Sequence, residues 1–148
     1  MKRFSILSVL MCVLMGGCGV SVPEAQHHVD ETPSIYPDYV GVTIPSNVVP
    51  LRFMVADDIE DAVAVLLAGQ CELVEKADEG KFLFSEKDWN RLVEAAKGDS
   101  ISVNVYEKKS GEWFAYRSFV FYVAEEPMDA CLAYRLIPPG YEQWHQMG

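Results

Sequence analysis

The sequence predicts a mainly β domain, an immunoglobulin or fibronectin III-like β-sandwich with one short inserted helix. About seven short segments alternate apolar and polar residues with a period of two, and glycine, proline and aspartate separate them. One segment, which begins at Ser85, has instead the apolar spacing and capping residues of a helix. The alternative is an α+β fold with an antiparallel sheet.

Residues 1–17 have the form of a lipoprotein signal peptide. Two basic residues precede an apolar run, residues 4–15, and two glycines then lead to Cys18. The run is short for a bilayer-spanning helix, which needs about 20 residues. Its end, "LMGGC", resembles the bacterial lipoprotein signal, in which the cysteine thiol receives a lipid before cleavage. We therefore expect a lipid on Cys18 to hold the protein on a membrane. The alternative is a secreted protein cut near Gly17.

The residue after Cys18 bears on the location. It is Gly19 and not aspartate, which by resemblance to well-studied lipoproteins argues against retention in the inner membrane. We expect a lipid-anchored protein of the bacterial cell envelope, on the outer membrane and facing the periplasm.

Residues 18–34 are expected to carry the lipid and form a flexible tether. The segment "GVSVPEAQHHVDETPS" contains two prolines and few large apolar residues. Its apolar residues follow neither the two-residue period of a strand nor the spacing of a helix. His27 and His28 are candidate metal ligands, but stable sites normally need three or four organised ligands. No metal site is predicted.

Residues 35–137 are expected to form the β-sandwich. In its first strand, large apolar side chains recur at every second position: Val49, Leu51, Phe53 and Val55. Because a proline cannot donate to a β-ladder, Pro50 suggests that this strand lies at a sheet edge.

The apolar residues of segment 57–85 fit both the period of a helix and the period of a strand. Ile59, Val63 and Leu66 match a helical stripe, but the β-branched content and the break at Gly69 favour strands. We predict strands near 62–68, 71–76 and 80–85, the last two joined by the turn "ADEG".

The one well-signalled helix follows Ser85. Ser85 and Asp88 form a capping box, Gly98 is placed to end the helix, and apolar residues recur at helical spacing: Trp89, Leu92, Val93 and Ala96. We expect Trp89 to anchor the helix in the core.

A hairpin is predicted after the helix. The turn "KKSGE" separates two segments with alternating apolar residues: Ile101, Val103 and Val105 before it, and Phe119, Phe121 and Val123 after it. A final strand is expected around "ACLAYRLI", followed by a connector at residues 138–148.

The composition argues against catalysis and against nucleic-acid binding. The chain has 12 basic and 22 acidic residues and a net charge of -10, and such a surface repels phosphate backbones. Histidine is the usual catalytic base, but His27, His28 and His145 all lie outside the predicted domain. No phosphate loop, HExxH or CxxCH motif occurs. We predict a non-catalytic protein without a cofactor. The alternative is a hydrolase of unspecified type. Two carboxylates could meet by folding, but no spacing in the sequence singles out a pair.

Cys71 and Cys131 are the other cysteines of the mature chain. In an oxidising periplasm they could form a disulfide. They could equally be two separate buried thiols, because cysteine is among the most buried residue types.

Five aromatic residues of the hairpin region could form a sugar-binding platform: Tyr106, Trp113, Phe114, Tyr116 and Tyr122. Trp113 and Tyr116 are the candidate ligand residues among them. Strands prefer aromatic residues in any case. Core packing and cross-strand pairing are therefore the simpler interpretation.

Three stretches resemble a known family: "IYPDYVGVTIPSNVVPLRFMV", "EAAKGDSISV" and "VAEEPMDACLAYRLIPPGYEQWHQMG". They are similar to the N-terminal region of TolB-like β-propeller envelope lipoproteins of Gram-negative gut anaerobes, often labelled cytochrome c biosynthesis proteins. In that family the chain continues into a CxxCH haem segment and a propeller, and this sequence contains neither. The resemblance runs from about Ile35 to Gly148. It implies that Tyr141 and Trp144 are docking residues of a connector, and it transfers no haem ligand.

The sequence thus predicts a membrane-anchored module that presents a surface to a protein partner in the cell envelope. The alternative is a carbohydrate-binding accessory domain that uses exposed aromatic side chains.

Overall fold

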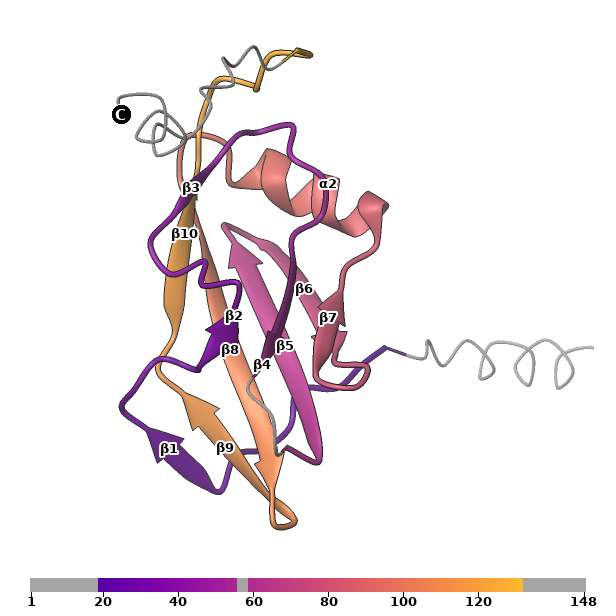
Figure 1. Cartoon of the computed structure of the whole chain (residues 1–148), viewed down its shortest axis with the longest axis vertical. Coiled ribbons are helices and arrows are strands. Elements are labelled where there is room, and N and C mark those ends of the chain that lie inside the picture. The colour runs from indigo at the N-terminus through magenta and orange to yellow at the C-terminus, as the bar shows by residue number, and fades with distance from the viewer. Residues whose placement is uncertain (1–18, 56–58, 132–148) are drawn as a thin grey trace, which may run out of the picture.

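The computed structural model describes residues 19–55 and 59–131, drawn in colour in Figure 1. Within these ranges the chain is mainly β with one short helix, so the predicted fold class is confirmed. The elements are β1 (His27–Val29), β2 (Ile35–Tyr36), β3 (Thr43–Ile44), β4 (Arg52–Val55), β5 (Asp61–Ala68), β6 (Cys71–Lys76), β7 (Lys81–Leu83), α2 (Glu86–Ala95), β8 (Ser100–Lys109), β9 (Glu112–Tyr116) and β10 (Phe119–Val123).

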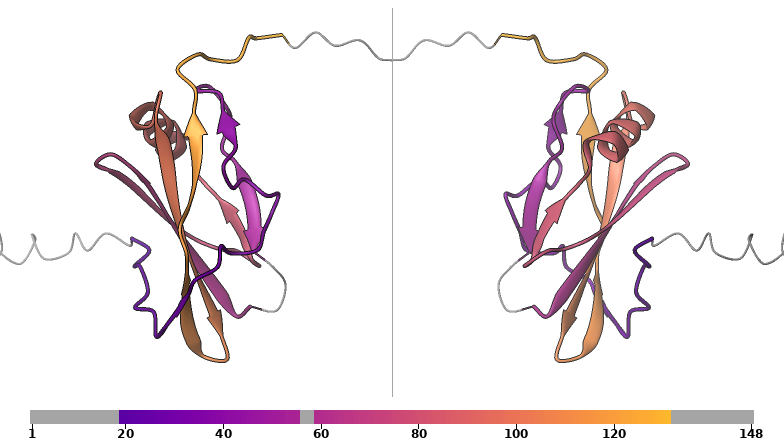
Figure 2. Two further views of the ribbon diagram at one scale, coloured as in Figure 1. Left: turned by 90° about the vertical axis from the view of Figure 1, so that its left-hand side faces the viewer. Right: turned by 90° about the vertical axis from the view of Figure 1, so that its right-hand side faces the viewer.

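The strands form two sheets that face each other as the layers of a sandwich (Figure 2). In the large sheet the long strand β8 is central. β5 pairs with one side of β8 and carries β6, while β9 and β10 share the other side. β1 extends the sheet beside β9 and β3 extends it beside β10, both in parallel. The small sheet is antiparallel, in the order β2-β4-β7.

The predicted hairpin is present, but its return arm is divided into β9 and β10. Tyr106 lies opposite Ala115, and Val103 lies opposite Phe119. The three-residue step from Val103 to Tyr106 in β8 therefore lies opposite a four-residue step, from Ala115 to Phe119, in the return arm. One extra residue makes a β-bulge, which bends the strand. The two halves of the arm consequently offer separate edges to β1 and β3.

The predicted tether contains the first strand, so that part of the prediction is wrong. Gln26 N donates to Trp113 O at 3.0 Å and Arg117 N donates to Val29 O at 3.0 Å, which ties β1 to β9. The polar composition of this segment hides the strand, because its partner is an edge formed much later in the chain. The folded domain begins near Gln26.

For residues 59–85, the described part of the segment that fits two periods, the strand interpretation is confirmed and the helical alternative is wrong. β5 and β6 lie where two strands were predicted and pair with each other. β7 also lies in its predicted segment, but it pairs with β4 in the small sheet. The turn "ADEG" therefore connects the two layers, with Gly80 at a φ of +77°.

β4 was expected at a sheet edge, and this expectation is wrong. The strand begins at Arg52, after Pro50, so the proline interrupts no ladder. β2 pairs with one side of β4 and β7 with the other. β4 is the central strand of the small sheet.

The core lies between the two sheets and is rich in aromatic side chains. Phe53 of β4 and Phe82 of β7 lie 4.9 Å apart between ring centroids. α2 packs against β6 and β5 beside the small sheet. Its Trp89 is fully buried, lies between Phe84 and Phe121, and anchors the helix in the core as predicted.

The predicted cap of α2 is confirmed. Asp88 N donates to Ser85 Oγ at 3.2 Å, and the Ser85 hydroxyl donates to Asp88 Oδ2 at 2.7 Å. Gly98 follows the helix with a φ of +74°, a conformation that glycine adopts without strain.

The predicted final strand lies, apart from its first residues, outside the described residues, as does the connector at 138–148. Among the described residues, no helix is long and apolar enough to cross a membrane.

Candidate functional site

The predicted site residues fall into two groups. Cys18, Tyr141 and Trp144 lie outside the described residues. Cys71 is half-buried on β6, and Cys131 is exposed after β10. Both are free thiols in the structure, so the disulfide that the sequence left open is not formed.

Neither histidine of β1 is part of a metal cluster in the described ranges, where no group of three or more potential ligands occurs. His27 instead packs on Phe114, with ring centroids 4.7 Å apart, and its Nε2 lies 2.8 Å from Glu112 Oε2. Both side chains of that pair are about half exposed. The histidine therefore helps to hold β1 against β9.

Trp113 and Tyr116 do not form one aromatic platform. They are three residues apart in β9, and side chains alternate between the two faces of a strand. Trp113 lies opposite Lys108, on the face away from the small sheet. Tyr116 points to the other face, where its hydroxyl accepts from Lys109 Nζ at 2.9 Å.

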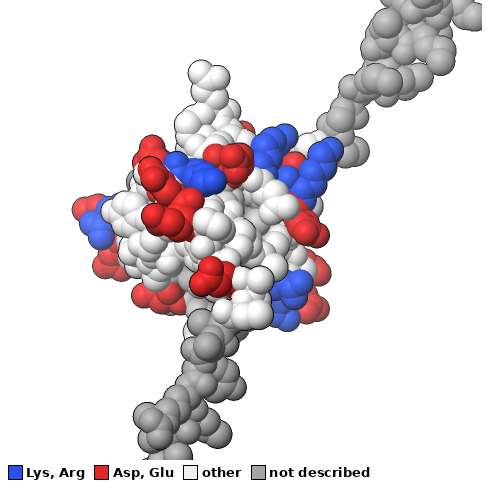
Figure 3. Space-filling view, turned by 90° about the horizontal axis from the view of Figure 1, so that it is seen from above, with Lys and Arg blue, Asp and Glu red and all other residues white. Residues whose placement is uncertain are grey.

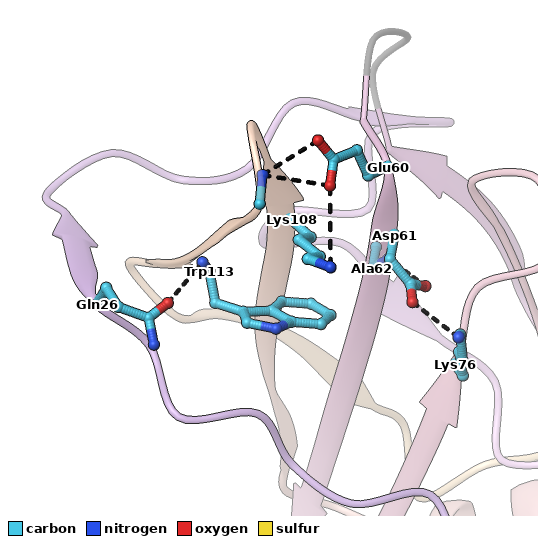
Figure 4. Close-up of polar contacts among 8 residues, drawn as sticks. Gln26, Glu60, Asp61, Ala62, Lys76, Lys108 and Trp113 are labelled. Carbon is cyan, nitrogen blue, oxygen red and sulfur yellow. Dashed lines mark hydrogen bonds and ion pairs between the residues drawn. The ribbon is translucent and has the colours of Figure 1, made fainter.

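Trp113 lies beside a row of paired charges on the outer face of the large sheet (Figure 4). Its backbone N–H donates to Gln26 Oε1 at 2.8 Å. Lys108 Nζ lies 3.9 Å from Glu60 Oε2, and a further ion pair joins Asp61 to Lys76 at 2.7 Å. The indole is half-buried. This region, the Trp113 surface, therefore combines an aromatic side chain with several hydrogen-bonding groups.

Tyr116 belongs to a polar cluster that includes one buried carboxylate. Lys109 Nζ lies 2.6 Å from Glu107 Oε2, and Glu107 is only 2% exposed. Burial lowers the pKa of Lys109, but the hydrogen bonds to Glu107 and Tyr116 outweigh this effect and the pKa is raised. Every buried side-chain nitrogen and oxygen in the described ranges has a hydrogen-bond partner. The Tyr116 hydroxyl is thus engaged in this cluster, while its half-buried ring lies on the face of β9 opposite to Trp113.

A different surface has the character of a binding site, and it lies on the small sheet. The inward residues Ile35, Phe53 and Phe82 fill the core. The outward residues form two cross-strand rows, which together we name the small-sheet face: Tyr36, Met54 and Lys81 in one row, Arg52 and Leu83 in the other.

Large apolar side chains of the small-sheet face meet solvent. Tyr36 is 73% exposed and Leu83 is 49% exposed. A shallow hollow of about 310 Å³ lies over this face and is lined by Tyr36, Pro37, Arg52, Phe53, Met54, Lys81, Phe82 and Leu83.

A groove of about 810 Å³ adjoins this hollow and shares Arg52 and Leu83 with it. Val49 is 76% exposed at its rim. The other lining residues are Tyr39, Pro50, Leu51, Phe84 and Glu86. The small-sheet face and the groove form one continuous, mainly apolar surface.

Two cations border this surface. Within the described ranges, neither Arg52 nor Lys81 takes part in an ion pair, whereas Glu86 supplies one carboxylate to the groove. The chain as a whole carries a net charge of -10. At the end of the molecule seen from above, acidic and basic side chains surround uncharged ones (Figure 3). The small-sheet face is a local exception to the acidic balance.

The sequence analysis missed the residues of the small-sheet face. Once "RFMV" and "KFLF" are known to be strands, alternation assigns Arg52, Lys81 and Leu83 to one face. Alternation does not tell which face is inside when both carry apolar side chains. No protein-family model, curated protein or solved structure matches the chain.

Proposed function

We propose that this chain is a non-catalytic lipoprotein module of the bacterial cell envelope, whose small-sheet face and groove bind a polypeptide. A lipid on Cys18 would hold it on a membrane. The observation that carries the proposal is the continuous exposed apolar surface, with Tyr36, Val49 and Leu83 as its most exposed parts. Contiguous apolar patches with polar rims are typical of protein interaction sites.

The chemistry of the surface favours a polypeptide over a small polar ligand. The groove is open and mostly lined by apolar side chains, with few polar groups that could orient a small molecule. Burying an aromatic side chain there would contribute about 25 cal/mol per Å² of apolar area. Arg52 and Lys81 would favour a segment that carries a carboxylate beside its apolar residues.

The proposed anchor would hold the domain close to the membrane. β1 begins nine residues after Cys18, and nine extended residues span at most about 30 Å. Residues 19–26 lie on the side of the large sheet away from the small sheet (Figure 2). The small-sheet face would then remain accessible to a partner.

The anchor is tested by labelling growing cells with a radioactive fatty acid. We expect label on the wild-type chain and none on Cys18→Ser, which should also leave the membrane fraction. Cys71→Ser is the matched control and should remain labelled. Equal labelling of Cys18→Ser would overturn this part of the proposal.

The binding surface is tested by photo-crosslinking in intact cells, with p-benzoylphenylalanine in place of Tyr36. We expect adducts with a polypeptide. The control position is Tyr122, an exposed aromatic residue on the large sheet. Absence of any polypeptide adduct at position 36, or equal adducts at both positions, would contradict a binding role for the small-sheet face.

A second candidate function is carbohydrate binding at the Trp113 surface. Its specific support is the indole beside Gln26, Glu60 and Asp61, since sugars stack on aromatic rings and bond to carboxylates and amides. Retention on immobilised glycans should then be lost in Trp113→Ala and kept in Tyr122→Ala. Failure of the wild-type chain to bind any glycan would exclude it.

A further inference from the structure

We propose that the polypeptide on the small-sheet face is the chain's own C-terminal segment, residues 132–148. Tyr141 and Trp144 would lie against the apolar groove, and Glu142 would face Arg52 and Lys81. This inference rests on the proposed function, because it names the occupant of the same surface.

The described chain is fixed near the groove at Met128, three residues before its last described residue. Asn47 Nδ2 donates to Met128 O at 2.9 Å, and Met128 N donates to Asn47 Oδ1 at 2.8 Å. These reciprocal bonds fix the segment after β10 to the loop before β4. Val49, two residues beyond Asn47, lines the groove. Met128 is therefore held close to this surface, and residues 132–148 begin four residues later in the chain.

The segment is long enough to reach the whole surface. Ten residues lead from Cys131 to Tyr141, and ten extended residues span at most about 35 Å. Residues 49–55, which border the groove and form the centre of the small sheet, span about 20 Å at the rise of a strand. Reach therefore does not limit the contact.

The chemistry of the segment matches the surface. Its one acidic residue is Glu142, and the aromatic residues Tyr141 and Trp144 stand on either side of it in the sequence. The surface offers two cations beside apolar side chains. A carboxylate between two aromatic side chains can bind such a surface through both kinds of contact.

Covalent connection favours this occupant over a separate protein or a second copy. A segment tethered by a short chain has an effective concentration in the millimolar range. A separate partner at micromolar concentration would need an affinity about a thousand times higher to compete. The chain's own segment thus has a large advantage for similar contacts.

The test identifies the adducts formed by full-length protein with p-benzoylphenylalanine at position 36, in native membranes. Mass spectrometry should find the benzophenone joined to a peptide from residues 132–148 of the same chain, and no such product from position 122. Adducts with another protein or with a second copy would overturn this inference but leave a binding role for the face. No adduct at all would overturn both.

A charge exchange tests the proposed pairing of Glu142. Arg52→Glu with Lys81→Glu should lower the intramolecular adduct about two- to five-fold, the range expected for exposed ion pairs. Adding Glu142→Arg should restore it. Lys97→Glu, an exposed cation after α2, is the control and should change nothing. An unchanged yield in the double reversal, or no recovery with Glu142→Arg, would overturn the pairing.

Discussion

Glu107 is the one charged residue that the described ranges place in the buried class, and its environment shows how this fold tolerates a carboxylate. Its neighbours along β8 on the same face, Val103 and Val105, are buried apolar side chains. Lys109 lies at 2.6 Å and is itself about one-third exposed, so the pair reaches the edge of the core. Breaking such a pair leaves an unpaired buried charge, which is strongly destabilising.

The first prediction concerns this pair. Lys109→Met keeps the apolar stem but removes the ammonium group, and we expect a loss of about 2 kcal/mol in the free energy of unfolding. Glu107→Gln in the same background should recover part of the loss, because no unpaired carboxylate remains. Urea unfolding measures both. A double variant less stable than Lys109→Met would contradict the interpretation.

The pH dependence of the same pair has a definite sign. The pKa of Lys109 is raised above its ordinary value of 10.5, so its charged form is favoured in the folded state. The resulting stability is fully present below pH 10.5 and is lost as the pH rises through the folded pKa. The difference in the free energy of unfolding between wild type and Lys109→Met should therefore become smaller at strongly alkaline pH.

The second prediction concerns Glu75 on β6. Burial and the nearby carboxylate of Asp88 raise its pKa above 4.5. Its ionised form is thus less favourable in the folded chain than in the unfolded chain, which costs stability at neutral pH. Glu75→Gln should stabilise the protein by less than about 1 kcal/mol at pH 7. This gain should disappear below pH 4.5, where the carboxyl is protonated in both states.

Glu72→Gln is the matched control for Glu75. Glu72 lies on the same strand but on the opposite face, and it is exposed. The variant Glu72→Gln removes the same charge but leaves the repulsion between Glu75 and Asp88 in place. An equal gain from both variants would show that overall net charge is the cause, and not the position of Glu75.

At the scale of single elements, α2 depends on its cap for a definite part of its stability. Ser85→Ala removes the oxygen that accepts from Asp88 N, and N-cap losses of this kind cost about 1 kcal/mol. Thermal unfolding followed by circular dichroism would measure the change. Ser118→Ala, at an exposed residue between β9 and β10, should have almost no effect. If Ser85→Ala does not change the thermal stability, packing of Trp89 alone determines where the helix starts.

Local elements could be predicted from the sequence where the signal lies within the element. The cap at Ser85, the strands β5 and β6 and the turn before β9 are of this kind. The pairing of β1 with β9 and of β7 with β4 could not be predicted, because hydrogen-bond partners far apart in the sequence leave no trace in composition. The central position of β4 was missed because Pro50 was placed inside the strand and not before it.

The candidate site was less predictable than the fold. Trp113 and Tyr116 were grouped because they are close in the sequence, although their odd spacing within one strand already assigns them to opposite faces. The small-sheet face depends on three strands that come together only through tertiary pairing. A single exposed Leu83 means little in the sequence, and its significance comes from Tyr36 and the groove beside it.

At the scale of the whole molecule, the two sheets share one core. Phe53 and Phe82 of the small sheet, Phe84 after β7, Trp89 of α2 and Phe121 of β10 make a chain of aromatic contacts with centroid separations between 4.9 and 6.2 Å. The strands of the small sheet are only two, four and three residues long, and its inward side chains belong to the same core cluster as those of the large sheet. We therefore expect it to unfold together with the large sheet.

The last prediction tests this cooperativity with Phe82→Ala. Phe82 is fully buried, and removal of a buried phenylalanine ring costs about 3 to 5 kcal/mol. Hydrogen exchange should accelerate by about the same factor in peptides from β4 and in peptides from β8, because both exchange through global opening. Tyr122→Ala, the same type of truncation at a half-exposed position, should accelerate exchange far less. If Phe82→Ala accelerates exchange in β4 while β8 keeps its protection, the small sheet is a separate, weaker unit. Docking on its outer face could then loosen it without unfolding the large sheet.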